Sequence, residues 1–202
     1  MSAQKVFDEG LVFKSERDWA ASENKFREAL SVLTDRDELT ASEIAHQLVL
    51  SLYQQGRLSD AMGEIVRIIP HLSPGPDAAW IHQLAGDINF ALGEYVEASR
   101  SYWTSWEIVQ QFDPDFFIEL EPSDFESELT SYYVTEDFVR AEKVVEMLPF
   151  SDDDKADLLW RIAEPHGAHE YHDSDISFIS FDTYERIVSE SIRLYPMYQN
   201  LY

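Results

Sequence analysis

Three histidines in one short segment are the residues of this chain whose types and spacing could hold a metal ion. His166, His169 and His172 follow one another at intervals of three residues within AEPHGAHEYHDSD, among several carboxylates. Imidazole and carboxylate groups bind Zn²⁺ and other divalent metals, and this spacing would align the histidines on one side of a helix. Pro165 and Gly167 predict a loop instead. A metal-dependent enzyme and a pH-sensitive patch are therefore alternatives to the interpretation we favour, an exposed polar connector.

Other catalytic signatures are absent from the sequence. The chain has no cysteine, and it contains none of the patterns GxGxxG, GxxxxGK[ST], HExxH or GxSxG. Its many carboxylates do not by themselves indicate acid–base catalysis, because that chemistry needs a pocket in which two pKa values are set apart. We therefore expect a protein that is not an enzyme and that uses neither a metal nor a cofactor.

The composition limits the classes of partner. The 202 residues include 39 Asp or Glu and 15 Lys or Arg, which gives a net charge of −24. Such a chain repels nucleic acids and anionic membranes, and it attracts basic surfaces. No apolar run reaches the roughly 20 residues that span a bilayer, and the start MSAQKVFDEG does not resemble a signal peptide. We expect a cytoplasmic protein that binds a protein partner with a basic surface, in an oligomeric state that the sequence does not indicate.

The acidic residues concentrate in the second half of the chain. The run 101–139 contains no Lys or Arg but has ten Asp or Glu and ten aromatic residues. One interpretation is a docking surface for a basic partner, and another is the core of acidic helices. A third is an immunity or antagonist protein that mimics nucleic-acid phosphates and blocks a nuclease or another nucleic-acid-binding protein. In that case the mimicking carboxylates would be those of Asp113, Asp115, Glu119 and Glu121.

Periodicity predicts an all-α protein. Apolar residues recur at intervals of three and four from the first residues to about 110, and again in DKADLLWRIA and FDTYERIVSESIRLYP. Only 176–181 shows a possible strand pattern. Three sequences resemble capping boxes at helix starts: Thr40 with Glu43, Ser123 with Glu126, and Asp182 with Glu185.

A four-residue turn recurs four times between pairs of expected helices. Its copies are Glu16-Arg-Asp-Trp19, Gln55-Gly-Arg-Leu58, Leu92-Gly-Glu-Tyr95 and Thr135-Glu-Asp-Phe138. Each turn is followed by a small residue and then by a packing residue, and each is preceded by a further packing position. The small residues are Ser22, Ala61, Ala98 and Ala141; the packing residues are Phe26, Ile65, Tyr102 and Val145; the preceding positions hold Gly10, Val49, Gly86 and Leu129.

This pattern resembles the tetratricopeptide repeat, in four copies over residues 3–149. The third copy, from Ile81 to Trp106, is the best match, and the fourth has Glu136 where the family has glycine. The resemblance implies an α-solenoid of antiparallel helix pairs with a protein-binding groove. We therefore expect helical repeats over 1–150 and a C-terminal helical cap with a His/Asp-rich connector over 151–202. The alternative is a generic helical bundle.

The family register implies which residues line the groove. The first column holds Phe7, His46, Gln83 and Glu126, and the second holds Leu11, Leu50, Asp87 and Thr130. The third holds Lys14, Tyr53, Phe90 and Tyr133. The resemblance thus implies a non-catalytic adaptor, chaperone or inhibitor that binds a basic or helical segment of a protein partner. The Lys, Arg and Asn clamp with which some family members hold a C-terminal carboxylate is missing. These residues could equally be packing positions between helices.

Overall fold

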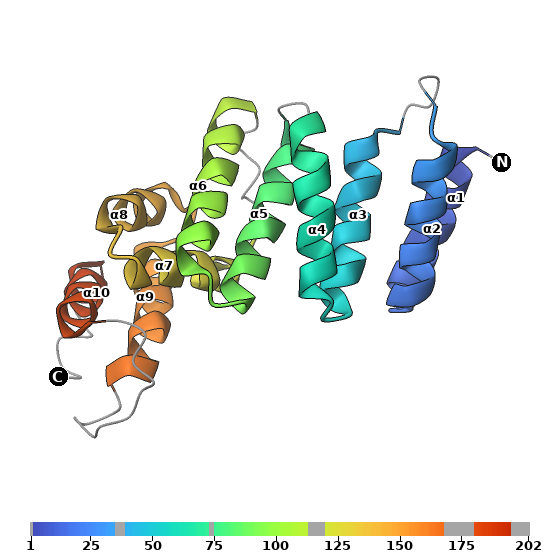
Figure 1. The fold of residues 1–202 in the computed structure, drawn as a ribbon. Helices are drawn as coiled ribbons and strands as arrows, with labels where there is room; N and C mark the ends of the chain where they lie inside the picture. The colour runs from blue at the N-terminus through green and yellow to red at the C-terminus, as the bar shows by residue number, and fades with distance from the viewer. Residues whose placement is uncertain (1, 35–38, 73–74, 113–119, 168–179, 195–202) are drawn as a thin grey trace. The chain divides into compact units, whose positions relative to one another are not determined.

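The structure is a computed structural model that describes residues 2–34, 39–72, 75–112, 120–167 and 180–194 (Figure 1). Within these ranges the chain forms ten α-helices and two short 3₁₀ helices, and no strand. The prediction of an all-α protein is confirmed. The α-helices are α1 Ala3–Ser15, α2 Trp19–Val32, α3 Ala41–Gln54, α4 Leu58–Ile68, α5 Pro76–Ala91, α6 Tyr95–Phe112, α7 Glu126–Val134, α8 Phe138–Met147, α9 Asp152–Gly167 and α10 Phe181–Leu194, and the 3₁₀ helices are η1 Ile69–His71 and η2 Pro122–Phe125.

The chain divides into two compact units. Unit 1 comprises Met1–Gly93 and Arg100–Pro114, and unit 2 comprises Glu94–Ser99 and Asp115–Tyr202. The expected boundary at residue 150 lies inside unit 2. In unit 1, helices that follow one another in sequence pack side by side, and α3 also contacts α5 (Figure 1).

The four predicted turns share one backbone conformation. Their second residues, Arg17, Gly56, Gly93 and Glu136, all have φ between 56° and 79°. This left-handed conformation is natural for glycine, and it costs about 1–2 kcal/mol in any other L-residue. In three of the turns the next amide donates to the carbonyl five residues earlier, as Asp18 does to Phe13 at 2.9 Å. These bonds satisfy helix-end carbonyls, so each turn ends one helix and positions the next.

Small residues let the two helices of a pair approach each other closely. A Cβ atom at Gly10 would lie 2.6 Å from the Phe26 ring, and one at Gly86 would lie 2.4 Å from the Tyr102 ring. Ser22 also donates from its Oγ to the Gly10 carbonyl at 3.1 Å. The small and packing residues predicted after the turns are all buried. The spacing in the sequence therefore reflects close contact within each pair.

Ion pairs connect α2 and α4, the second helices of the first two pairs in unit 1. Glu23 binds Arg27 at 3.0 Å and Arg57 at 2.5 Å, and Arg27 also binds Glu64 at 2.7 Å. Glu64 in turn binds Arg67 at 2.7 Å. Although burial raises the pKa of Glu23, hydrogen bonds from Gln55 and Arg27 and the charge of Arg57 lower it overall. The second helices of the first two pairs thus carry mutually neutralised charges.

Unit 2 contains two further helix pairs, α7 with α8 and α9 with α10. Buried Tyr132 donates to buried Glu128 at 3.2 Å. Arg186 on α10 lies 4.2 Å from the centre of the Phe138 ring on α8 and forms an ion pair with Glu142. Ser191 of α10 donates to the Ala156 carbonyl of α9 at 3.0 Å.

Two predicted helix starts and one predicted loop were wrong. Thr40 and Glu43 do form the capping box of α3. However, the box near residue 123 joins Glu121 to Asp124 at the start of η2, because Pro122 begins a 3₁₀ turn before α7. Ser180, rather than Asp182, accepts the Thr183 amide at the start of α10. The loop expected at 165–167 is helical backbone, since α9 continues to Gly167. Most of the possible strand at 176–181 lies outside the described residues, and residue 181 begins α10.

Candidate functional site

The first helices of the three pairs in unit 1 bring polar and aromatic side chains together. We call this set the A face: Lys14 on α1; His46, Gln47 and Tyr53 on α3; and Trp80, Gln83 and Asp87 on α5. All but Gln83 are partly accessible to solvent. The contacts described below run from α1 across α3 to α5 and α6, so the A face is one connected surface.

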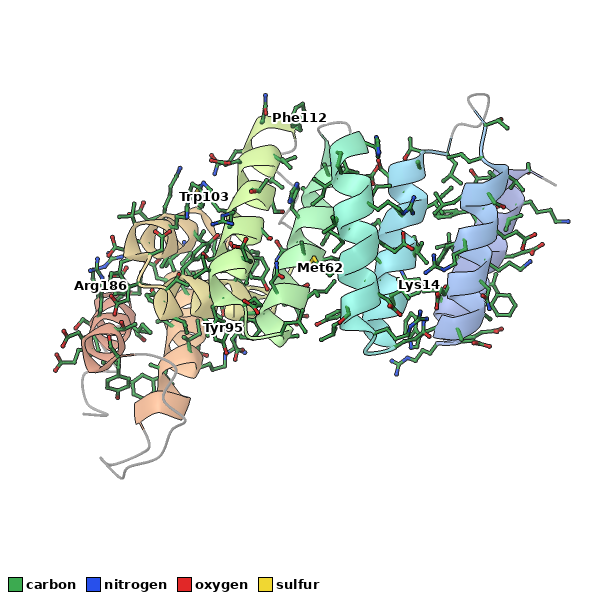
Figure 2. The ribbon with its side chains drawn as sticks, viewed as in Figure 1. Lys14, Met62, Tyr95, Trp103, Phe112 and Arg186 are labelled. Carbon is green, nitrogen blue, oxygen red and sulfur yellow. The ribbon has the colours of Figure 1, made fainter. Side chains whose placement is uncertain are left out.

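Lys14 and Gln47 join α1 to α3. Lys14 donates from its Nζ to Gln47 Oε1 at 2.7 Å, and it lies between the α1–α2 pair and α3 (Figure 2). Burial lowers the pKa of Lys14. The ammonium can donate up to three hydrogen bonds, and one of them goes to Gln47. Lys14 is therefore a half-buried cation whose hydrogen-bond partner is a neutral amide.

His46 and Trp80 join α3 to α5. Their rings are nearly parallel, with centroids 5.9 Å apart and an interplanar angle of 6°. Burial, and then the positive charge of Lys14, lower the pKa of His46 to about 4. The imidazole is thus neutral near pH 7, and the stacked pair is a half-buried aromatic contact within electrostatic reach of Lys14.

Gln83 lies one helical turn after Trp80 and contributes a buried acceptor. Its side chain is 9% exposed, and its Oε1 atom accepts no hydrogen bond within the described part of the chain. A buried carbonyl oxygen without a donor costs about 1–3 kcal/mol. Because this oxygen is itself closed to solvent, a ligand N–H could bond to it, and remove that cost, only after the Gln83 side chain turned outward.

Asp87 and Tyr53 form the other end of the A face. Tyr102 on α6 donates to Asp87 Oδ1 at 2.8 Å. Burial, and then the charge of Asp87, raise the pKa of Tyr53. The A face therefore has a cation at the α1 side and a carboxylate near α6.

The structure places the other predicted groove residues in several environments. Phe7 is buried against Phe26, with ring centroids 5.5 Å apart, whereas Leu11 is exposed. Leu50 packs on the core and Phe90 is half-buried. The remaining three lie on α7 in unit 2: Glu126 and Thr130 are half-buried, and Tyr133 is buried beside Phe138. The A face described here thus draws on the predicted residues of unit 1.

Most of the other candidate residues lie outside the described residues. This holds for Asp113, Asp115 and Glu119 of the phosphate-mimic hypothesis. The Glu121 side chain accepts the backbone N–H of Asp124, and the Glu121 backbone N–H donates to the Asp124 side chain, at the start of η2. His169 and His172 also lie outside, and His166 is placed only as backbone of α9. Within the five described ranges, no group of three or more His, Asp or Glu side chains could hold a metal ion.

Gln47 and Trp80 belong to the A face but were not predicted. Gln47 is adjacent to His46 in sequence, and Trp80 precedes Gln83 by three residues, so both lie beside predicted positions. The family register omits them because it names only the residues nearest the groove axis. Gln47 lies one turn before Leu50 and Trp80 one turn before Gln83, so a search for polar and aromatic residues one turn from the predicted positions would have found both.

Comparisons with known proteins identify no family. No family model matches the sequence, and no curated protein matches it. None of the described helices is long and apolar enough to cross a membrane.

Proposed function

We propose that this chain is a non-catalytic, tetratricopeptide-like binding module, an adaptor, chaperone or inhibitor that holds a basic or helical segment of a protein partner. The observation that carries the proposal is the fourfold repetition of one helix–turn–helix geometry, with left-handed turn residues at Arg17, Gly56, Gly93 and Glu136. Repeated helix pairs stack to bury a continuous core and leave an extended face that suits protein binding.

The distribution of contacts between the two sides of unit 1 supports the A face as the binding surface. On α2 and α4 the charges form ion pairs with one another. On the A face, by contrast, the structure leaves a buried acceptor at Gln83 and donors at Lys14. Interfaces are enriched in aromatic residues; Tyr53 and Trp80 supply them on the A face, and half-buried Phe90 follows Asp87 by one turn on α5.

The acidic charge supports a partner with a basic surface. At −24 the chain accelerates encounter with positively charged proteins, and this attraction weakens as salt increases. Encounter can be driven by the acidic charge, while hydrogen bonds and apolar contacts on the A face hold the partner.

The test is affinity capture from lysate of the source cell, comparing the wild type with two sets of variants. One set removes two aromatic residues predicted for the groove, Tyr53→Ala on the A face and Phe90→Ala one turn after Asp87 on α5. The other set reverses charge at Asp113, Asp115, Glu119 and Glu121. Val66→Ala is the matched control, because Val66 is exposed on α4. Circular dichroism melting curves exclude variants that fail to fold.

The binding module proposed here loses its partner with the aromatic variant and keeps it with Val66→Ala. Loss with the charge reversals alone would support the nucleic-acid-mimicking antagonist instead. A partner that survives both sets of changes, or no specific partner at all, would contradict the proposal. Heat released on titration with Zn²⁺ or Mn²⁺, and lost with His166→Ala plus His169→Ala, would favour the metal-dependent enzyme.

A further inference from the structure

The cations of unit 1 differ in exposure and in partners: Lys5 and Arg17 are exposed, and several others form ion pairs. Lys25, Arg27, Arg57 and Arg67 each bind at least one carboxylate, at 2.5 to 3.1 Å. Lys14 differs, because its ammonium binds the neutral amide of Gln47 and forms no ion pair with any described residue. In a chain with 39 acidic residues, a half-buried lysine that pairs with none of the described ones is a specific local arrangement.

The groups packed around Lys14 leave its positive charge unbalanced. Lys14 itself lies on α1, and the side chains that face it from α3 are Gln47 and the uncharged ring of His46. Burial is the cause of the lowered pKa of Lys14, and no acidic group contributes to the pKa of either Lys14 or His46. Lys14 therefore carries a positive charge that none of the described side chains in contact with it offsets.

A second, independent observation is the buried acceptor of Gln83, which indicates what the backbone of the ligand contributes. The Gln83 side chain is only 9% exposed, and its acceptor oxygen has no donor within the described ranges. In a helix the backbone N–H groups beyond the first turn are already bonded to carbonyls of the same helix. In an extended segment they point outward and can bond to another protein.

We propose that Lys14 binds the carboxylate of an Asp or Glu side chain in an extended segment of the protein partner, and that the Gln83 side chain turns outward to accept a backbone N–H of that segment. The inference rests on the proposed function and refines it. The partner carries basic residues that favour encounter, and one acidic residue that the positive end of the A face recognises. The stacked His46–Trp80 pair lies on α3 and α5, between the positions of Lys14 and Gln83 along the A face.

This arrangement also sets specificity. A basic side chain at the same position of the segment would face Lys14 across a short distance, and like charges at an interface disfavour the wrong partner or register. The acidic surface attracts a basic segment in any register. Lys14 therefore selects the register that places the acidic residue of the segment next to it.

The test uses the full chain and a phage-displayed library of random 12-residue peptides. Enriched peptides are synthesised with an amidated C-terminus, so that a side chain is the only source of carboxylate. Binding is measured by fluorescence anisotropy for the wild type, Lys14→Met, Lys14→Glu and Lys5→Met. Lys5→Met is the matched control, because it removes an exposed positive charge from the same helix.

We expect one Asp or Glu in the peptide whose replacement by Asn or Gln weakens binding to the wild type about tenfold or more. The same replacement should have little effect on binding to Lys14→Met, and Lys at that position should restore binding to Lys14→Glu. Lys5→Met should behave as the wild type. N-methylation of one peptide amide should weaken binding to the wild type but not to Gln83→Met.

Three results would overturn the inference. They are a peptide whose acidic residue is dispensable, an acidic residue whose contribution is the same with and without Lys14, and a library that yields no enriched peptide. None of these results contradicts the proposed function. That proposal is tested separately, by capture of the cellular partner and by the dependence of this capture on Tyr53 and Phe90. A captured partner that tolerates Lys14→Met would leave the binding module standing without this contact.

Discussion

The ring of Tyr102 occupies the space that a side chain at Gly86 would need. A Cβ atom at Gly86 would lie 2.4 Å from Cδ1 and Cε1 of that ring, and Tyr102 is fully buried. The Tyr102 hydroxyl also donates to Asp87 at 2.8 Å. Tyr102 therefore takes part both in the packing of α5 against α6 and in a hydrogen bond to Asp87, the carboxylate at one end of the A face.

Gly86→Ala is expected to lower the free energy of unfolding by about 1–3 kcal/mol, because the Tyr102 ring cannot move without disturbing its packing and its hydrogen bond. Gly63→Ala is the matched control, since Gly63 lies in α4 and a Cβ atom there would have nothing within 4 Å. At Gly63 the change should stabilise the protein by about 0.5–1 kcal/mol. Urea unfolding measures both, and equal effects at the two glycines would contradict the close approach of α5 and α6.

The shared turn conformation predicts opposite effects of glycine at equivalent positions. Arg17 is exposed with φ of 60°, whereas Gly93 has φ of 79°. Arg17→Gly should raise the free energy of unfolding by up to about 1 kcal/mol, and Gly93→Ala should lower it by about 1 kcal/mol. Arg17→Ala loses the same side chain but keeps the Cβ atom, and should bring no gain. If Arg17→Gly and Arg17→Ala are equally stable, the turn is not left-handed.

The neutral state of His46 predicts a pH dependence of stability. Its pKa is about 4 in the folded protein and about 6.5 in an unfolded chain, so the unfolded state binds more protons between these values. The contribution is therefore fully present above about pH 6.5 and is lost as the pH falls towards 4, by at most about 3 kcal/mol. His46→Phe keeps a ring against Trp80 but cannot titrate, so it should lose less stability between pH 7 and 5 than the wild type does. Parallel pH profiles of the two proteins would contradict the burial of His46.

Glu23 stands at the centre of the ion pairs between α2 and α4. Glu23→Gln leaves Arg27 and Arg57 without this carboxylate, and should lower the free energy of unfolding by about 1 kcal/mol at low salt and by less at about 0.5 M NaCl. Asp60→Asn is the comparison, because Asp60 is more than half exposed and binds Arg57 alone. Its effect should stay under about 0.5 kcal/mol. An effect of Glu23→Gln that salt does not reduce would argue against an electrostatic role.

The helices and their turns could be predicted from the sequence because local residues specify them. Apolar spacing indicated the faces that pack, and the recurring turn placed Arg17 and Glu136 at the positions that Gly56 and Gly93 hold in the other two copies. Helix starts were less predictable. Several Ser, Asp and Glu residues near 121–126 and 180–185 can cap a helix, and the choice depends on how Pro122 and Ser180 fit the tertiary structure.

The A face could be predicted only in part. The register placed His46, Tyr53, Gln83 and Asp87 on it, since equivalent positions of repeated helices align. It could not show that Lys14 bonds to Gln47 or that His46 stacks on Trp80, because those contacts depend on the tilt between neighbouring helices. Phe7 and Tyr133 occupied the same register positions but are buried, so identical positions need not be equally accessible.

Hydrogen–deuterium exchange of the full chain, alone and saturated with its captured partner, tests the binding module most directly. The account predicts that the partner slows amide exchange in α1, α3 and α5 and leaves exchange in α2 and α4 nearly unchanged. Protection confined to α2 and α4, or to unit 2 alone, would contradict the claim that the A face binds the partner.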